Sequence, residues 1–302
     1  MAKPKSPLLS FGARGTIADS LTFQKRGRTT IARTKPIPTD PYSLAQAYQR
    51  WDYQDYAYLW TLQSEAVKQT YRTRASRYHI TGFSLWMREH LRDLPDLVGR
   101  WHLDELGGAT VYDSSKQGNN GTIFGPTPTD GLIAGAYHFD GTNDYIDCGN
   151  NPVLNLLGLT VTFEAFVKTS TVVQIELLLK TGIGPYWIFT IRAEGTVWAQ
   201  MWDGAKQMRA SSIGVVNDGI WHHIAAVLEN NVQAKAYIDG IDDSAAPTIQ
   251  DLTPSAPTGN MLIGSNAVSG NWFAGDADHI VIHNRVLDPT EILRHSKRRY
   301  PV

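Results

Sequence analysis

The chain has 302 residues, 42% of them hydrophobic and 19% charged, with a formal net charge of −1. This composition supplies enough apolar material for a folded core and excludes an intrinsically disordered chain, and the single cysteine, Cys148, excludes an internal disulfide. Lys and Arg number 15 against 8 Asp and Glu up to residue 99, and 13 against 21 after it, which indicates two modules with different partners.

The N-terminus carries basic residues but no apolar run of signal-peptide length follows it, and no stretch approaches about 18 apolar residues. We therefore expect a protein that is made in a cytoplasm, without a classical export signal and without a membrane span.

The first predicted module, residues 1–98, begins with a hairpin and continues with helices. Residues 20–25 and 29–34 read as two strands around Gly27, which suits a tight turn, and the prolines in 35–41 predict an extended linker. Ser43 is a candidate N-cap, with Gln46 completing a capping box. A second helix covers about 63–78, with Ser64 as its cap, and a third covers 84–94.

Aromatic residues between positions 48 and 60 are too dense for one face of one helix: Tyr48, Trp51, Tyr53, Tyr56, Tyr58 and Trp60. Some of them would form the core of a small module. We interpret the surplus as an interface with a partner subunit, with Trp51, Tyr53 and Tyr56 as contacts, because Tyr and Trp are enriched at interfaces. Arg26 and Arg28 would dock on an acidic protein surface such as a virion shell; the alternative is that the basic residues form a solvated face. The basic excess contains no recognised nucleic-acid motif, so specific nucleic-acid reading is not expected.

This first module resembles a small module of phage and prophage structural proteins, which implies a role in assembly or docking. The resemblance spans about 75 residues and rests on the hairpin, the proline linker, the aromatic helix and a closing turn. The matching residues are Ser20, Leu21, Phe23, Gly27, Arg33, Lys35, Pro38, Pro41, Ser43, Ala45, Gln46, Arg50, Trp60, Gly82, Phe83, Trp86 and Arg88.

The second predicted module, residues 99–302, reads as a mainly β fold. Short alternating strands recur every ten or so residues and are separated by Gly, Asn, Asp and Pro, which predicts an antiparallel β-sandwich. Residues 221–227 and 234–240 form the clearest pair, closed by Asp239-Gly240. Asp288 as N-cap and Pro289 at the first helical position predict a short terminal helix.

Several separated motifs in this module resemble the laminin-G-like, concanavalin A-like lectin/glucanase sandwich, a jelly roll. They occur at 98–105, 113–121, 135–146, 159–167, 221–240, 262–264 and 273–292. Glycosidase relatives of this fold carry two glutamates in E-x-D-x-x-E. Here Glu164, Glu176, Glu194 and Glu229 are isolated, and His222 and His223 stand where the family uses the pair structurally, so we expect that the protein is not an enzyme.

The resemblance also implies candidate binding residues. Many relatives hold a structural Ca²⁺ through loop oxygens, for which the candidates are Asp113, Asn119, Asn120, Asp140 and Asp278; the alternative is that these residues form turns. Candidates for stacking on sugar rings are Tyr186, Trp187, Trp198, Trp202 and Trp272; the alternative is core packing for at least half of the tryptophans.

Together these features predict a non-enzymatic phage virion structural protein of the decoration, spike or vertex type. Residues 1–98 would anchor it to other capsid or tail proteins as a homo-oligomer, and the lectin-like module would contact host-surface glycans or neighbouring subunits. The alternative is a bacterial carbohydrate-binding protein, secreted or on the cell surface.

Overall fold

The structure, a computed structural model, describes residues 15–17, 21–26, 29–34, 43–156, 159–180, 184–266 and 270–299. The chain forms two compact units, residues 1–46 and 47–302. In the first unit, β1 (Gly15–Ile17), β2 (Leu21–Arg26) and β3 (Thr29–Thr34) pair antiparallel in the order β1-β2-β3. The predicted hairpin is therefore present in the backbone, and β1 adds a strand that the sequence pattern did not predict.

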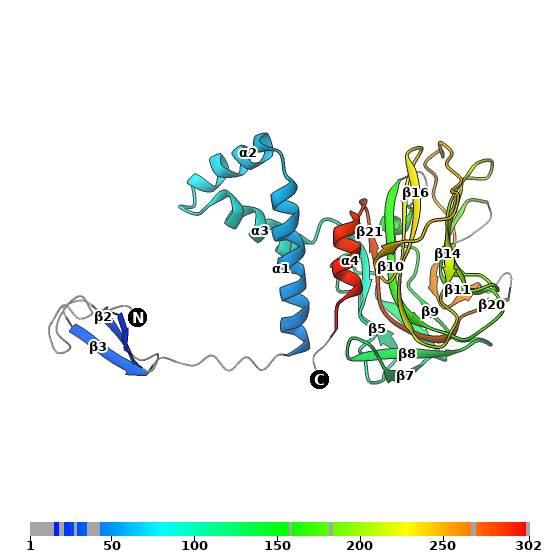
Figure 1. Ribbon diagram of the computed structural model, residues 1–302, viewed down its shortest axis with the longest axis horizontal. Helices are drawn as coiled ribbons and strands as arrows, with labels where there is room; N and C mark the ends of the chain where they lie inside the picture. Colours follow the sequence, from blue (N-terminus) through cyan, green and yellow to red (C-terminus); the bar gives the residue numbers. More distant parts are fainter. Residues whose placement is uncertain are drawn as a thin grey trace. The chain divides into compact units, whose positions relative to one another are not determined.

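The second unit is built around two antiparallel sheets that stack as a sandwich (Figure 1). Within the described residues, the first sheet has eight strands in the order β17-β16-β15-β10-β21-β8-β7, with β4 also paired to β21. These strands are β4 (Leu97–Trp101), β7 (Thr127–Asp130), β8 (Gly135–Asp140), β10 (Thr160–Lys168), β15 (Trp221–Glu229), β16 (Gln233–Ile238), β17 (Ile241–Asp242) and β21 (Ala274–His283).

The second sheet, in the same part of the chain, has eight strands in the order β14-β13-β12-β11-β18-β9-β6-β5. They are β5 (Thr110–Val111), β6 (Gly121–Phe124), β9 (Tyr145–Asp147), β11 (Ile175–Lys180), β12 (Tyr186–Ile191), β13 (Thr196–Trp202), β14 (Gln207–Val215) and β18 (Met261–Ile263). A two-stranded ribbon, β19 (Ser265–Asn266) with β20 (Asn271–Trp272), and a 3₁₀ turn at Pro152–Leu154 complete it. The predicted antiparallel sandwich is confirmed.

The core fills the space between the two sheets. Phe163 of the first sheet lies against Trp187 and Phe189 of the second, with ring centroids 5.2 and 5.6 Å apart, and all three are fully buried. Aromatic pairs at this spacing add to the stability that comes from burying apolar area.

Four helices belong to the chain's described part: α1 (Leu44–Leu62), α2 (Glu65–Ser76), α3 (Gly82–Asp93) and α4 (Pro289–Ser296). The predicted caps are confirmed at Ser43 with Gln46, at Ser64 and at Asp288. The third helix begins at Gly82 rather than residue 84, because Thr81 caps it by accepting a hydrogen bond from Ser84 N. No helix among the described residues has the length and apolarity to cross a membrane.

The helices cover the outer face of the first sheet. Tyr56, Trp86 and Leu94 pack with Leu97 and Val281 of the sheet, while Ile292 of α4 packs with Ala225, Val227 and Tyr237. As a result β10 and β15 are buried on both faces, whereas β13 alternates between buried and half-buried positions. The outward side chains of β13 and β14, together with Tyr186 of β12, keep contact with solvent, and we call this surface of the second sheet the open face. The rest of β12 and all of β11 are buried.

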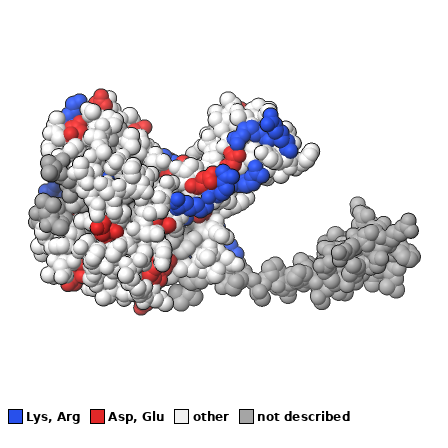
Figure 2. All heavy atoms as spheres, turned by 180° about the vertical axis from the view of Figure 1, so that it is seen from behind, with Lys and Arg blue, Asp and Glu red and all other residues white. Residues whose placement is uncertain are grey.

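The division of the chain differs from the predicted boundary at 98/99. Asp52 of α1 accepts two hydrogen bonds from Arg100 of β4, at 2.5 and 3.1 Å, and the hydroxyl of Tyr48 donates to Asp104. Helices α1 to α3 therefore belong to the sandwich unit. The charge difference nevertheless persists on the surface, since Lys and Arg gather over the helical part on the face drawn in Figure 2.

Candidate functional site

The open face presents a row of aromatic and amide side chains along β13. Val197, Ala199 and Met201 point inward and are fully buried, so Trp198, Gln200 and Trp202 point outward and are half-buried. Trp198 Nε1 donates to Gln200 Oε1 at 3.3 Å, and Gln200 Nε2 donates to Gln207 Oε1 of β14 at 2.9 Å. The row thus combines flat apolar rings with amides that exchange hydrogen bonds.

Tyr186 extends this row onto β12. It lies directly opposite Trp202 in the register, with ring centroids 5.5 Å apart and ring planes at 42°. Burial, and then the charge of Glu176, raises the pKa of Tyr186, so the hydroxyl stays a donor over the whole physiological range. Tyr186 and Trp202 form an aromatic pair of the kind on which the apolar face of a sugar stacks.

Two arginines lie over Trp198. The guanidinium carbons of Arg192 and Arg209 are 4.2 and 4.5 Å from its ring centroid, which is the cation–π geometry. Arg192 also pairs with Glu194 at 3.3 Å. Trp198 therefore holds two cations rather than a free ring face, and this end of the row is positively charged.

A second aromatic group stands on β6, β9 and β20. Tyr145 stacks on Phe124 at 4.7 Å, and Trp272 lies 6.1 Å from Tyr145. Nearby, Asn271 and Gln174 both donate to Glu176 Oε1, at 3.1 and 3.0 Å. Trp272 is thus half-buried beside Tyr145, and the structure groups it with that ring instead of with Trp202.

The interpretation of Trp187 as a sugar contact is wrong. Trp187 is fully buried in the core, and its Nε1 donates to Leu154 O at 3.0 Å. Because neighbouring residues of a strand point to opposite faces, Tyr186 and Trp187 cannot both lie on the open face.

The residues predicted to bind calcium lie in three separate hydrogen-bond networks. Asp113 accepts from the backbone N of Arg100, Ser115 and Asn119, and Asn120 accepts from Asp113 N. Asp140 accepts from Thr142 N in a separate turn. Asp278 is fully buried on β21 and accepts from Leu132 N and Ile133 N. The three aspartates do not form a cluster among the described residues, so calcium stays a prediction.

The predicted assembly residues contact their own chain. Tyr56 is buried and accepts a hydrogen bond from Trp86 Nε1 through its carbonyl, and Trp51 lies under Arg298, whose guanidinium carbon is 5.4 Å from the ring. Tyr53 is 48% exposed and remains available to a partner. For Arg26 only the backbone is described, and Arg28 lies outside the described residues. The aromatic surplus of α1 is used mostly to cover the first sheet.

Sequence reasoning missed a buried polar cluster beneath α4. Glu164 of β10 is surrounded by ring nitrogens of His223, His283 and His295, and all four residues are buried. Its members are far apart along the chain, and they meet only because β10 pairs with both β15 and β21 and α4 folds back over them. We call these four residues the Glu164 cluster.

Comparison with known proteins places these features in a family. A model described as the concanavalin A-like lectin/glucanases superfamily matches residues 140–293. No curated protein sequence matches the chain.

Solved structures with a similar fold include domain 4 of an extracellular arabinanase from Geobacillus stearothermophilus in complex with arabinotriose, at a TM-score of 0.53 and 17% identity over 67% of this chain and 98% of that one. The binding domains of Paraclostridial Mosquitocidal Protein 1 and of botulinum neurotoxin serotype G match at a TM-score of 0.51, with 16% and 14% identity over 67% of this chain. The chain spans about half the length of those two toxin domains, 52% and 50%. At such identities the likeness shows the fold.

Proposed function

The chain belongs to the concanavalin A-like lectin/glucanase superfamily, and from that premise we propose that it binds carbohydrate on the open face of its second sheet. The observation that carries this proposal is the Tyr186–Trp202 pair, which stands half-buried beside the amide row of Gln200 and Gln207. The helices cover part of the corresponding face of the first sheet, whereas the outward side chains of β13 remain half-buried.

The chemistry of the open face suits a saccharide. Aromatic rings bury the C–H faces of sugars, and amide groups both donate to and accept from hydroxyls. Three structures with a similar fold support this use, since one was solved in complex with arabinotriose and two are named as toxin binding domains.

We further propose that the preferred saccharide carries a carboxylate. Arg209 and Arg192 add positive charge beside Trp198, and a guanidinium matches a carboxylate through two parallel hydrogen bonds. An acidic sugar bound across β13 would place its ring near Trp202 and its charge near the arginines.

The test is binding of the full chain to an array of neutral and acidic glycans, followed by calorimetry with the best ligand. Trp202→Ala should weaken binding at least tenfold, about 1.4 kcal/mol, and Arg209→Gln should reduce the preference for acidic over neutral glycans. Tyr78→Ala is the matched control, because Tyr78 is 57% exposed and lies after α2. Absence of binding on the array, or an equal loss in the control, would refute the site.

Three further proposals rest on the sequence: that the protein is a non-enzymatic virion component, that it assembles as a homo-oligomer and that it holds structural Ca²⁺. Light scattering of the full chain against residues 47–302 tests the assembly role of the first unit. If the full chain and the fragment are both monomers, the result would favour the alternative, a bacterial lectin-like protein.

A further inference from the structure

The Glu164 cluster brings three metal-ligand atoms together in a buried place. Glu164 Oε2 is 2.9 Å from His295 Nδ1 and 3.0 Å from His283 Nε2, and the ligand atoms of these three residues lie within 4.8 Å of one another. His223 Nε2 adds a third nitrogen, 3.4 Å from Glu164 Oε1. Two strands, β10 and β21, and helix α4 supply the three residues.

We propose that Glu164, His283 and His295 form a binding site for a divalent transition metal of the Zn²⁺ class. Two imidazole nitrogens and one carboxylate are a set that zinc uses, with bonds of about 2.0–2.2 Å. Tetrahedral bonds of that length hold ligand atoms about 3.3–3.6 Å apart. The contacts to Glu164 Oε2 would therefore widen by roughly half an ångström to admit the ion.

Residues around the three ligands could orient them, as the outer residues of a metal site do. His295 Nε2 lies 3.2 Å from Asp55 Oδ1, and Asp55 is held in turn by Arg294 at 2.8 Å and Arg298 at 2.5 Å. A carboxylate on the far nitrogen orients the imidazole ring. Without a metal ion, His295 Nδ1 donates a hydrogen bond to Glu164 Oε2, and the ion would take the place of that proton. Asp55 lies on α1, so the site would tie both α1 and α4 to the first sheet.

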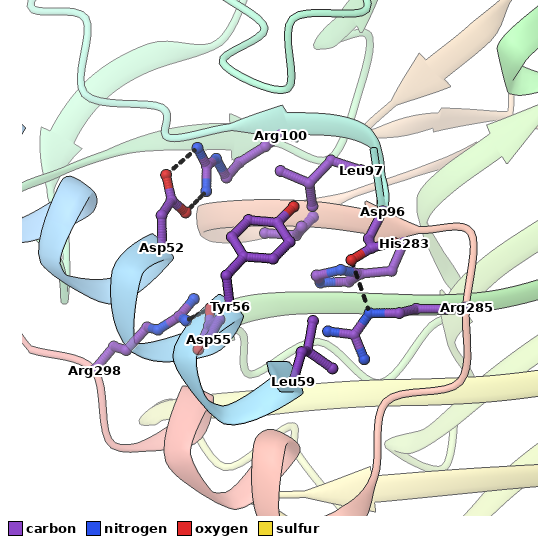
Figure 3. Close-up of a pocket in the computed structure, with 11 residues that line it drawn as sticks. Asp52, Asp55, Tyr56, Leu59, Asp96, Leu97, Arg100, His283, Arg285 and Arg298 are labelled. Atoms are coloured by element: carbon purple, nitrogen blue, oxygen red, sulfur yellow. Dashed lines mark hydrogen bonds and ion pairs between the residues drawn. The ribbon is translucent and has the colours of Figure 1, made fainter. Parts of the chain in front are cut away.

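A small cavity lies next to one member of the cluster, His283. It is lined by Asp55, His283 and Arg298 among other residues, and Figure 3 shows His283 and Asp55 on two sides of it, beside Tyr56. Its volume of about 20 Å³ is enough for one water molecule.

The experiment measures zinc on the full chain after chelator treatment and dialysis. Wild-type protein equilibrated with Zn²⁺ should retain one equivalent by elemental analysis, and Co²⁺ should give the visible absorption of a four-coordinate ion with nitrogen and oxygen ligands. His283→Asn should lower zinc affinity at least a hundredfold, and Asp55→Asn should lower it 10- to 100-fold.

His222→Asn is the matched control, since His222 on β15 contacts Asp218 and Asp239 outside the cluster. Its affinity should equal that of wild type. If His283→Asn fails to fold, the cobalt spectrum of wild type decides alone. Retention of less than a tenth of an equivalent, lack of the spectrum, or loss of binding in His222→Asn with retention in His283→Asn would overturn the proposal.

Discussion

The ion pair between Asp52 and Arg100 tests whether α1 is part of the sandwich. The two side chains are only 16% and 10% exposed, and Arg100 donates to both carboxylate oxygens and also to Ser114 Oγ at 2.9 Å. Removing one partner of a buried pair leaves the other charge without compensation, which costs about 3–5 kcal/mol. We therefore expect Arg100→Met to lower the free energy of unfolding by about that amount.

Urea unfolding of residues 47–302 provides the measurement. Asp52→Asn should cost a similar amount to Arg100→Met, and the double variant should cost less than their sum, with a coupling of about 2 kcal/mol. Arg92→Met is the matched control, because the Arg92–Asp93 pair is exposed, at 71% and 52%, and should change nothing measurable.

Two results together would refute the conclusion that α1 to α3 belong to the sandwich unit. If Arg100→Met unfolds at the same urea concentration as the control, and residues 99–302 are as stable as residues 47–302, then α1 to α3 form a separate module as the charge pattern first indicated. If the fragment from residue 99 is unstable or insoluble, the helices are an integral cover of the first sheet.

Three further predictions concern stability. Trp187→Ala should cost about 3–5 kcal/mol in urea unfolding because it empties a core position, and a cost below 1 kcal/mol would contradict its place in the core. Asp288→Ala removes the N-cap of α4, whose side chain accepts from Thr290 N and Glu291 N, and should cost about 1 kcal/mol in thermal unfolding; an unchanged melting temperature would argue against that cap. Burial raises the pKa of Asp104 from 3.8 to about 6, against the hydrogen bonds from Tyr48 and Gly135 N, so the native state keeps a proton that the unfolded chain releases between those values. The stability from this proton is complete below about pH 4 and is lost as the pH rises through 6; it amounts to about 1–2 kcal/mol once partial exposure is allowed for. Asp104→Asn should flatten the pH dependence of stability between pH 4 and 6, and an unchanged slope would show that other groups cause it.

Much of the fold follows from local patterns in the sequence. The alternation of residues along 196–202 indicates a strand with one face toward solvent. The strand β13 has that pattern, with Trp198 and Trp202 on the solvent-facing side. The caps at Ser64 and Asp288 are equally local, since a polar side chain that accepts from the next turn's N–H marks where a helix begins.

The parts that could not be predicted depend on which strands are neighbours. Glu164 and His283 are separated by more than a hundred residues, and they meet because the β10–β21 register places Thr162 opposite His283. Sequence periodicity fixes the two faces of a strand but not the element that covers each face. For that reason Glu164 was an isolated glutamate in the sequence, and Trp51 and Tyr56 were assigned to a partner subunit.

The outward faces of the two sheets differ in what covers them. On the first sheet, outward positions such as Glu164 and Val281 are buried under the helices. Charged groups join the helices to the sheet. Burial alone would raise the pKa of Asp55 on α1, but the charges of Arg298 and His295 hold that pKa well below its usual range. Removing one of these partners would leave a buried charge without compensation, which favours the observed arrangement of the helices. On the second sheet, the outward rings of Tyr186 and Trp202 are half-buried and pack against each other, so the proposed ligand would cost little side-chain ordering there. The helices therefore cover the sandwich on one side, which agrees with our proposal that an extended saccharide binds on the open face.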